Sequence, residues 1–159
     1  MRREGFWAIG GYKISFRRDG CWYADEEVIA NRRISRLFSR HLRGDGEGGW
    51  VIDVGIDCHP VTVEDTPLVV TWVDGDPGSG FTIRTNDDES EVLDCTSLEV
   101  GEAEVLYCEV NRGERGRMRA RFLRPAYYAL AAYVELEGGR PVLRCRGHSF
   151  PIGGAVTVH

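Results

Sequence analysis

The first residues with a regular pattern are 12–17, Tyr-Lys-Ile-Ser-Phe-Arg, in which polar and apolar positions alternate. Alternation with a period of two is typical of a strand that buries one face. The pair Asp19-Gly20 follows, which is a strong signal for a tight hairpin turn. Residues 21–23, Cys-Trp-Tyr, read as the returning strand, so this segment predicts a β-hairpin.

The period changes to that of a helix between residues 31 and 43. Four apolar residues stand at i, i+3, i+4 and i+8 and form one stripe: Ile34, Leu37, Phe38 and Leu42. Asn31 is a typical N-cap, and Gly44 takes the position after the last turn that glycine favours. Five arginines lie on the opposite side: Arg32, Arg33, Arg36, Arg40 and Arg43. We therefore expect an amphipathic helix with a basic outer face.

The same order of elements recurs at the end of the chain. After the first helix, residues 50–54 and 59–63 predict a pair of strands. The predicted elements of the second copy are strands at 105–110 and 117–122, a helix from 125 to 138, and a closing hairpin at 141–145 and 148–152. Between the copies, a further hairpin is predicted at 68–73 and 81–85, with its loop at 74–80.

These elements predict an α+β protein built from two tandem strand–helix–hairpin motifs. Helices do not alternate with strands, which disfavours a parallel α/β sheet. We expect curled antiparallel sheets, each covered by one helix, in an N-terminal domain of residues 1–66 and a C-terminal domain of residues 67–159. The stretches 49–61 and 139–152 share the order Gly, apolar strand, Gly, His, Pro, aliphatic, which favours an internal duplication.

Charge is distributed unevenly along the 159 residues, whose net charge is −5. Residues 1–44 have a net charge of +5, residues 45–111 of −16 and residues 112–159 of +6. Two interpretations stay open: the basic ends neutralise the acidic middle within the fold, or some arginines line a groove for an anionic ligand. The overall acidity disfavours a general nucleic-acid surface.

Five cysteines stand at positions 21, 58, 95, 108 and 145. An odd number at such wide spacing predicts buried, reduced thiols and not a disulfide framework or a structural zinc site. No apolar run approaches the roughly 20 residues that a membrane span needs, and the first residues lack the apolar stretch of a secretory signal. We expect a cytoplasmic protein with no membrane association, metal or cofactor.

No catalytic constellation assembles from the sequence. Residues 44–49 satisfy G-x-G-x-x-G, but they follow a helix and precede a strand, the reverse of a dinucleotide fingerprint. Residues 86–91, Asn-Asp-Asp-Glu-Ser-Glu, lack the spacing of a calcium loop and read as a solvated loop. A hydrolase that uses His59 or Asp65 is a third hypothesis, which requires these side chains to meet in one pocket. We expect a binding protein rather than an enzyme.

Two arginines outside the first helix are candidates for an anion site. Arg84 lies in a predicted strand, and Arg124 directly precedes the second helix. One hypothesis is that both meet an anion while Trp22, Tyr127 or Tyr128 stacks on a base; the other is that they belong to a solvated surface. The alternative function is a protein-interaction adaptor that docks on an acidic partner through the basic face of the first helix.

Several short stretches resemble the bacterial domain-of-unknown-function family 1285. They are residues 18–23 (Arg-Asp-Gly-Cys-Trp-Tyr), 63–68 (Val-Glu-Asp-Thr-Pro-Leu), 81–86 (Phe-Thr-Ile-Arg-Thr-Asn), 124–130 (Arg-Pro-Ala-Tyr-Tyr-Ala-Leu) and 147–153 (Gly-His-Ser-Phe-Pro-Ile-Gly). The chain departs from the family at Thr66 and Leu68, where the family tends to Ala and Phe, and in the Arg-rich segment 113–121.

The resemblance implies a duplicated α+β motif whose second half looks like a pleckstrin-homology-type barrel. It also implies a groove between the halves for a nucleotide-like ligand and a part in signalling, without catalytic residues. We therefore predict a non-enzymatic sensor or signalling module that binds a small anionic ligand. The predicted ligand-binding residues are Arg18, Trp22, Tyr23, Asp65, Arg84, Asn86, Arg124, Tyr127, Tyr128 and His148.

Overall fold

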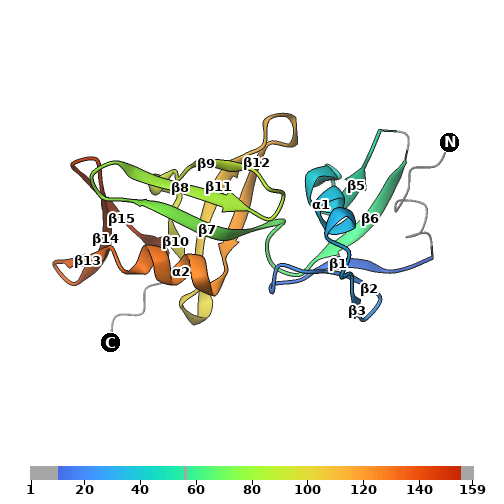
Figure 1. The fold of residues 1–159 in the computed structure, drawn as a ribbon, viewed down its shortest axis with the longest axis horizontal. Coiled ribbons are helices and arrows are strands. Elements are labelled where there is room, and N and C mark those ends of the chain that lie inside the picture. Colours follow the sequence, from blue (N-terminus) through green and yellow to red (C-terminus); the bar gives the residue numbers. More distant parts are fainter. Residues whose placement is uncertain (1–10, 56, 155–159) are drawn as a thin grey trace. The chain divides into compact units, whose positions relative to one another are not determined.

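The chain folds into two compact units, Met1–Pro67 (unit 1) and Leu68–His159 (unit 2). The computed structural model describes residues 11–55 and 57–154. Each unit combines strands with an α-helix, so the α+β prediction is confirmed (Figure 1). The described residues form two large sheets that curl but stay open and a third, smaller sheet.

Unit 1 holds a six-stranded sheet in the order β3-β2-β1-β6-β5-β4. Its strands are β1 (Ile14–Phe16), β2 (Trp22–Ala24), β3 (Glu27–Val28), β4 (Leu42–Gly44), β5 (Trp50–Asp53) and β6 (Cys58–Val63). The predicted first hairpin is β1 and β2, with Phe16 opposite Trp22. However, β1 and β6 pair in parallel, so the prediction of a purely antiparallel sheet is wrong here. Alternation of apolar residues specifies a strand but not the direction of a distant partner.

The first helix, α1 (Arg32–His41), begins where the sequence predicts. The side chain of Asn31 accepts two backbone N–H groups of the first turn at 3.0 and 3.1 Å. The helix ends at His41, two residues before its predicted end. Leu42 is buried and starts β4, where it stands opposite Ile52. Strand pairing therefore overrides the helical spacing of Leu42.

Aromatic rings fill the core of unit 1. Trp22 is 1% exposed and packs against Phe16 and Phe38, with ring centroids 4.9 and 5.5 Å apart. Its indole Nε1 donates a hydrogen bond to Oγ of Ser39 at 2.9 Å. Phe38 and Ser39 both lie on α1, so the core holds the predicted apolar stripe of the helix against the sheet.

Unit 2 holds a seven-stranded sheet in the order β16-β10-β11-β12-β7-β8-β9 and a three-stranded sheet in the order β13-β14-β15. The large sheet consists of β7 (Leu68–Asp76), β8 (Gly80–Thr85), β9 (Ser90–Val92), β10 (Glu99–Val100), β11 (Leu106–Asn111), β12 (Arg117–Phe122) and β16 (Gly153–Gly154). The small sheet consists of β13 (Val134–Glu137), β14 (Arg140–Cys145) and β15 (His148–Pro151). Two pairs of the large sheet, β10 with β16 and β12 with β7, are parallel and again differ from the prediction.

Alternation along β8, β11 and β12 buries one face of the large sheet. In β12, Met118, Ala120 and Phe122 are buried, whereas the arginines that alternate with them, at 117, 119 and 121, face outward. The second helix, α2 (Arg124–Ala131), packs on β7 and buries Ala126 and Leu130 (Figure 1). The backbone N–H of Leu123 donates to the carbonyl of Val70 at 3.0 Å and fixes the start of the helix on that strand.

The second helix is shorter than predicted, because residues 134–137 form β13 and not a helix end. This strand pairs with β14 across a turn made by Gly138 and Gly139, whose φ angles are +59° and +81°. Both angles lie in the left-handed region that glycine adopts without strain. The alternation Val-Glu-Leu-Glu was the strand signal, and the apolar run that precedes it led to the longer helix prediction.

Candidate functional site

Carboxylates hold many of the arginines that the charge pattern singled out. In unit 1, Arg17 pairs with Glu26, Arg18 with Glu64 and Arg43 with Asp53, at 3.0, 3.1 and 2.5 Å. In unit 2, Arg117 pairs with Asp94, Arg119 with Glu99 and Arg144 with Glu135, at 3.4, 2.9 and 2.8 Å. Most of these acids come from the acidic middle of the sequence. The pairs support the interpretation that basic and acidic segments neutralise each other within each unit.

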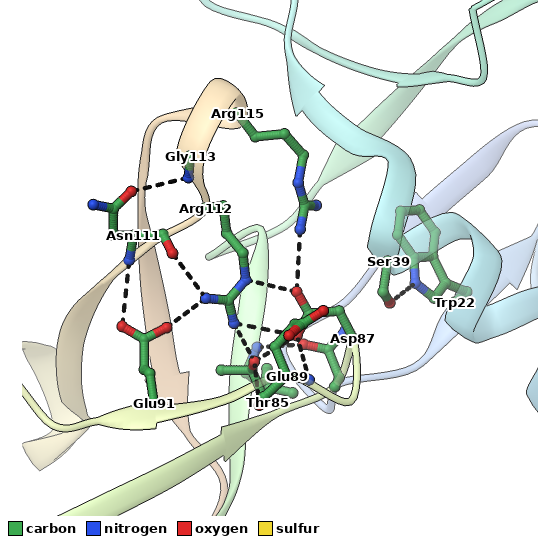
Figure 2. A network of polar contacts seen from close by, with 12 residues as sticks. Trp22, Ser39, Thr85, Asp87, Glu89, Glu91, Asn111, Arg112, Gly113 and Arg115 are labelled. Carbon is green, nitrogen blue, oxygen red and sulfur yellow. Dashed lines mark hydrogen bonds and ion pairs between the residues drawn. The ribbon is translucent and has the colours of Figure 1, made fainter.

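The most buried of these contacts is a network around Arg112, which lies between β11 and β12 (Figure 2). The Arg112 side chain is 7% exposed and that of Asp87 is fully buried. Nε of Arg112 donates to Oδ2 of Asp87 at 2.7 Å, and Nη2 donates to Oγ1 of Thr85 at 2.5 Å. Nη1 donates to Glu91 and to the carbonyl of Asn111. Each nitrogen of this guanidinium is therefore hydrogen-bonded.

The network bridges the curl of the large sheet. Glu91 lies on β9, and its carboxylate also accepts the backbone N–H of Asn111 on β11 at 3.4 Å. Three strands separate β9 from β11 in the sheet order, so these two strands do not pair through their backbones. Side-chain hydrogen bonds connect them instead. A second arginine, Arg115, donates to Oδ2 of Asp87 at 3.2 Å. The open sheet is thus held at one end by a buried ionic cluster.

The position of Asp87 corrects the sequence analysis, which read residues 86–91 as a solvated loop. Burial alone would raise the pKa of the Asp87 carboxyl. Hydrogen bonds from Arg112 and Thr85, together with the charges of Arg112 and Arg115, outweigh burial and hold this pKa below its usual value. Asp87 is therefore an ionised structural residue.

Two predicted binding residues of unit 1 are aromatic, and both have local roles. Trp22 lies in the core, so its ring is not accessible for stacking in this fold. The hydroxyl of Tyr23 donates to Oδ2 of Asp19 at 2.5 Å, and the Arg17 guanidinium lies 3.9 Å from its ring centroid. The hydrogen bond to Asp19 raises the pKa of Tyr23.

The other two candidates of unit 1, Arg18 and Asp65, are exposed. Both the backbone N–H and Nε of Arg18 donate to Oε1 of Glu64, at 2.8 and 3.1 Å. These bonds, the backbone one foremost, lower the pKa of Glu64. The Glu64 carboxylate therefore already compensates the charge of Arg18. Asp65 lies two residues beyond β6, the strand that holds half-buried His59.

Arg84 differs in its surroundings from the arginines that pair with carboxylates. It is exposed on β8, and its guanidinium carbon lies 5.7 Å from the ring centroid of Trp72 on β7. Its Nε donates to Oγ of Ser90 on β9 at 3.4 Å. Among the residues that the structure describes, no carboxylate pairs with Arg84. The guanidinium therefore lies between an aromatic ring and a hydroxyl with its terminal nitrogens available.

Two further candidates, Asn86 and Arg124, are tied to the same stretch of β7. The Asn86 side chain accepts the backbone N–H of Val69 at 2.9 Å, so it has a structural role. Oγ1 of Thr71 donates to the carbonyl of Arg84 at 3.2 Å. Arg124 is exposed and directly follows Leu123, whose N–H is bonded to Val70. These hydrogen bonds bring the chain at residues 84, 86 and 124 to residues 69–71.

The remaining candidates lie on α2 and β15. Tyr127 is half-buried and Tyr128 is 65% exposed, with their ring centroids 5.4 Å apart. His148 is exposed and lies 6.3 Å from the ring of Phe150. The described contacts do not link His148 to Arg84 or Arg124. Arg84, Arg124 and the two tyrosines are therefore the candidates that unit 2 places around β7.

Four of the five arginines predicted for the basic face lie on α1. Arg32, Arg33, Arg36 and Arg40 are all exposed. The first turn holds no acidic residue that would favour the positive end of the helix dipole. Arg43 has left this face, because it lies on β4 and pairs with Asp53.

Other features of the described residues give no alternative site. A hollow of about 210 Å³ in unit 2 is lined by Ser97, Glu99, Tyr107, Cys108, Glu109 and Arg119 and contains none of the predicted residues. The five cysteines are free, and Cys95, Cys108 and Cys145 are buried as expected, whereas Cys58 is exposed. Within residues 11–55 and 57–154, no group of His, Cys, Asp and Glu is arranged to hold a metal ion, and no helix is long and apolar enough to cross a membrane.

Trp72 is the residue that the sequence analysis missed. It lies two positions after Val70, so alternation along β7 would group it with that buried valine on the inner face. Trp72 is instead 46% exposed. Its pairing with Arg84 depends on the register of β7 and β8, which contains a shift between Val70 and Trp72.

No family model and no curated protein matches the chain. Two solved structures do. A DUF1285 family protein from Silicibacter pomeroyi DSS-3 has a TM-score of 0.72 at 20% identity, over 98% of this chain and 97% of that one. A DUF1285 family protein from Shewanella baltica OS155 has a TM-score of 0.59 at 18% identity, over 77% of this chain and 92% of that one. The chain therefore has the fold of DUF1285 family proteins, which is the family that its sequence motifs resemble.

Proposed function

We propose that the protein is a non-enzymatic sensor or signalling module that binds a small anionic, nucleotide-like ligand. The observation that carries this proposal is the environment of Arg84. Acids of the same unit compensate Arg112, Arg117, Arg119 and Arg144, whereas Arg84 has Trp72 and Ser90 as neighbours. An exposed guanidinium without a carboxylate is suited to two oxygens of a phosphate or carboxylate.

Arg124 supports the same assignment. It is exposed at the first position of α2. The preceding residue, Leu123, is bonded to Val70 of β7, and β7 pairs with the strand that carries Arg84. Of the described residues, none forms an ion pair with it. Two cations near one strand attract an anion more strongly than either alone, because their potentials add. The placement of the ligand between the two units, which the resemblance implies, stays a prediction.

A thermal-shift screen with nucleotides and phosphorylated metabolites tests this function. A ligand that binds only the folded state raises Tm, by an amount equivalent to about 2.7 kcal/mol at 100 times Kd. We expect stabilisation at millimolar concentrations and its loss in the double variant Arg84→Gln/Arg124→Gln. Arg140→Gln is the matched control, because Arg140 is also exposed in unit 2 and forms no ion pair with a described residue. The absence of any stabilisation by these anions would refute the proposal.

The basic face of α1 favours a second candidate, an adaptor that docks on an acidic protein partner. Four exposed arginines within ten residues give unit 1 a concentrated positive surface. The double variant Arg36→Glu/Arg40→Glu should abolish capture of such a partner while the circular dichroism spectrum is retained. Arg18→Gln serves as a control, because Glu64 already compensates that charge. Unchanged capture would rule out docking through this face.

The finer features of the predicted fold belong to the same proposal. Both units contain a strand pair, a helix and a closing hairpin in this order, which supports an internal duplication. Their strand pairing differs, because β6 joins β1 whereas β13, β14 and β15 form their own sheet. A curled sheet with a helix packed on β7 supports the comparison of unit 2 with a pleckstrin-homology-type barrel.

A further inference from the structure

An exposed tryptophan lies beside Arg84 on the outer face of the large sheet. Trp72 is 46% exposed, although tryptophan is highly buried on average. It stands directly opposite Arg84 in the register of β7 and β8. We propose that Trp72 is the stacking partner of the ligand, so that the ligand carries a planar aromatic ring beside its anionic group. This inference rests on the proposed function and names a binding residue and a ligand chemistry for it.

The strand register defines a row of three side chains. Arg84 is flanked by Trp72 on β7 and by Ser90 on β9. Neighbouring strands lie about 4.8 Å apart, so this row extends over about 10 Å. An aromatic ring that is linked to a phosphate through a sugar spans a similar length. The row therefore places a cation and a hydroxyl beside an aromatic surface, within the length of such a ligand.

The contacts of Arg84 orient it for this purpose. Its Nε is bonded to Oγ of Ser90, and its carbon lies 5.7 Å from the Trp72 centroid. The two Nη groups donate to none of the described residues. They form the side of the guanidinium fork that binds two oxygens of a phosphate or carboxylate. The same side chain thus supplies the anion contact next to the ring of Trp72.

The next row of side chains on this face, Asp74, Thr82 and Val92, borders the proposed site. Asp74 follows Trp72 on the outer face of β7 and is exposed, opposite Thr82. Val92, 63% exposed, stands opposite Thr82 on β9 and gives an apolar border. Two residues along a strand correspond to about 6.7 Å. The carboxylate of Asp74 therefore repels an anion at Arg84, and its removal should strengthen binding about threefold.

The test compares adenosine 5′-monophosphate with ribose 5-phosphate by isothermal titration calorimetry on the full chain. The two probes share the sugar and phosphate and differ in the aromatic base. Trp72→Ala should weaken binding of the monophosphate by about 5- to 150-fold and leave that of ribose 5-phosphate unchanged, because one stacked base contributes about 1–3 kcal/mol. Trp72→Phe, which keeps an aromatic face, should retain much of the preference. Arg84→Gln should weaken both probes, and Asp74→Asn should strengthen both.

Leu136→Ala and Arg140→Gln are matched controls, because Leu136 is 72% exposed and Arg140 is exposed in the same unit. If both probes bind through Arg84 but Trp72→Ala keeps the preference for the base, the role of Trp72 is refuted and the proposed function stands. If neither probe binds the wild-type protein, both are refuted. Circular dichroism of each variant separates a lost contact from a lost fold.

Discussion

The network around Arg112 allows a quantitative prediction. Arg112→Met keeps an apolar stem of similar length but removes the guanidinium from contact with Asp87, Glu91 and Thr85. Breaking a buried ion pair by removing one partner costs about 3–5 kcal/mol, because the remaining charge is left uncompensated. Arg115 stays 3.2 Å from Asp87, so we expect the lower end, about 3 kcal/mol. Typical domains have only about 5–15 kcal/mol of stability.

Urea denaturation at neutral pH measures this loss. With a typical slope m of about 1–3 kcal/mol/M, a loss of about 3 kcal/mol lowers the midpoint by about 1–3 M. Tryptophan fluorescence follows both units, because Trp72 lies in unit 2 and the other three tryptophans, at 7, 22 and 50, lie in unit 1. Far-UV circular dichroism follows the whole chain and shows whether the units unfold together.

Arg117→Met is the matched control. Arg117 starts β12, but its side chain is 55% exposed and its pair with Asp94 measures 3.4 Å. Exposed pairs contribute about 0–1 kcal/mol, because water screens them. If Arg112→Met and Arg117→Met lower stability equally, the network does not hold the sheet as we argue. A double-mutant cycle of Arg112→Met with Asp87→Asn separates the pairwise coupling from general disruption.

Two further predictions concern other parts of the fold. Because the pKa of Asp87 is lowered in the fold, its contribution to stability is complete above the pKa of the unfolded state, about 3.9, and is lost as the pH falls through the folded pKa. The stability difference between wild type and Asp87→Asn, measured by urea titrations from pH 7 to pH 3, should therefore shrink in acid. A constant difference would contradict this assignment. Ser39→Ala removes the acceptor of the buried Trp22 indole N–H and should destabilise unit 1 by about 1–3 kcal/mol. Ser149→Ala on exposed β15 is the control and should change stability little. Equal effects of the two substitutions would contradict the role of the Trp22–Ser39 hydrogen bond.

Elements with a complete local signal were predicted well. α1 has an apolar stripe and an Asn cap, and both are present in the fold. The boundaries failed where pairing with another strand decided the outcome, as at Leu42 on β4 and at residues 134–137 on β13. Parallel pairs such as β1 with β6 depend on contacts between distant segments, so no local pattern reveals them.

The candidate site shows the same division. Exposure of Arg84 and Arg124 follows from their positions in a strand and at a helix start. Burial of Trp22 could be anticipated from alternation, because Trp22 stands opposite buried Phe16 in the first hairpin. The burial of Asp87 could not, because its partner Arg112 lies 25 residues away and both residues occupy turns. Ion pairs between side chains of two distant loops leave no periodic pattern in the sequence.

Strand pairing explains why the local density of arginines is a poor guide to binding. Arg119 lies at the centre of the Arg-rich segment, yet it stands opposite Glu109, pairs with Glu99 and covers the ring of Tyr107 at 4.0 Å. The segment that departs most from the family pattern is therefore compensated within its own sheet. Arg84 is isolated in the acidic middle of the sequence, but its register places it opposite Trp72 and Ser90, neither of which carries a charge. A cation that strand pairing leaves without an acid keeps its attraction for an anion from solution.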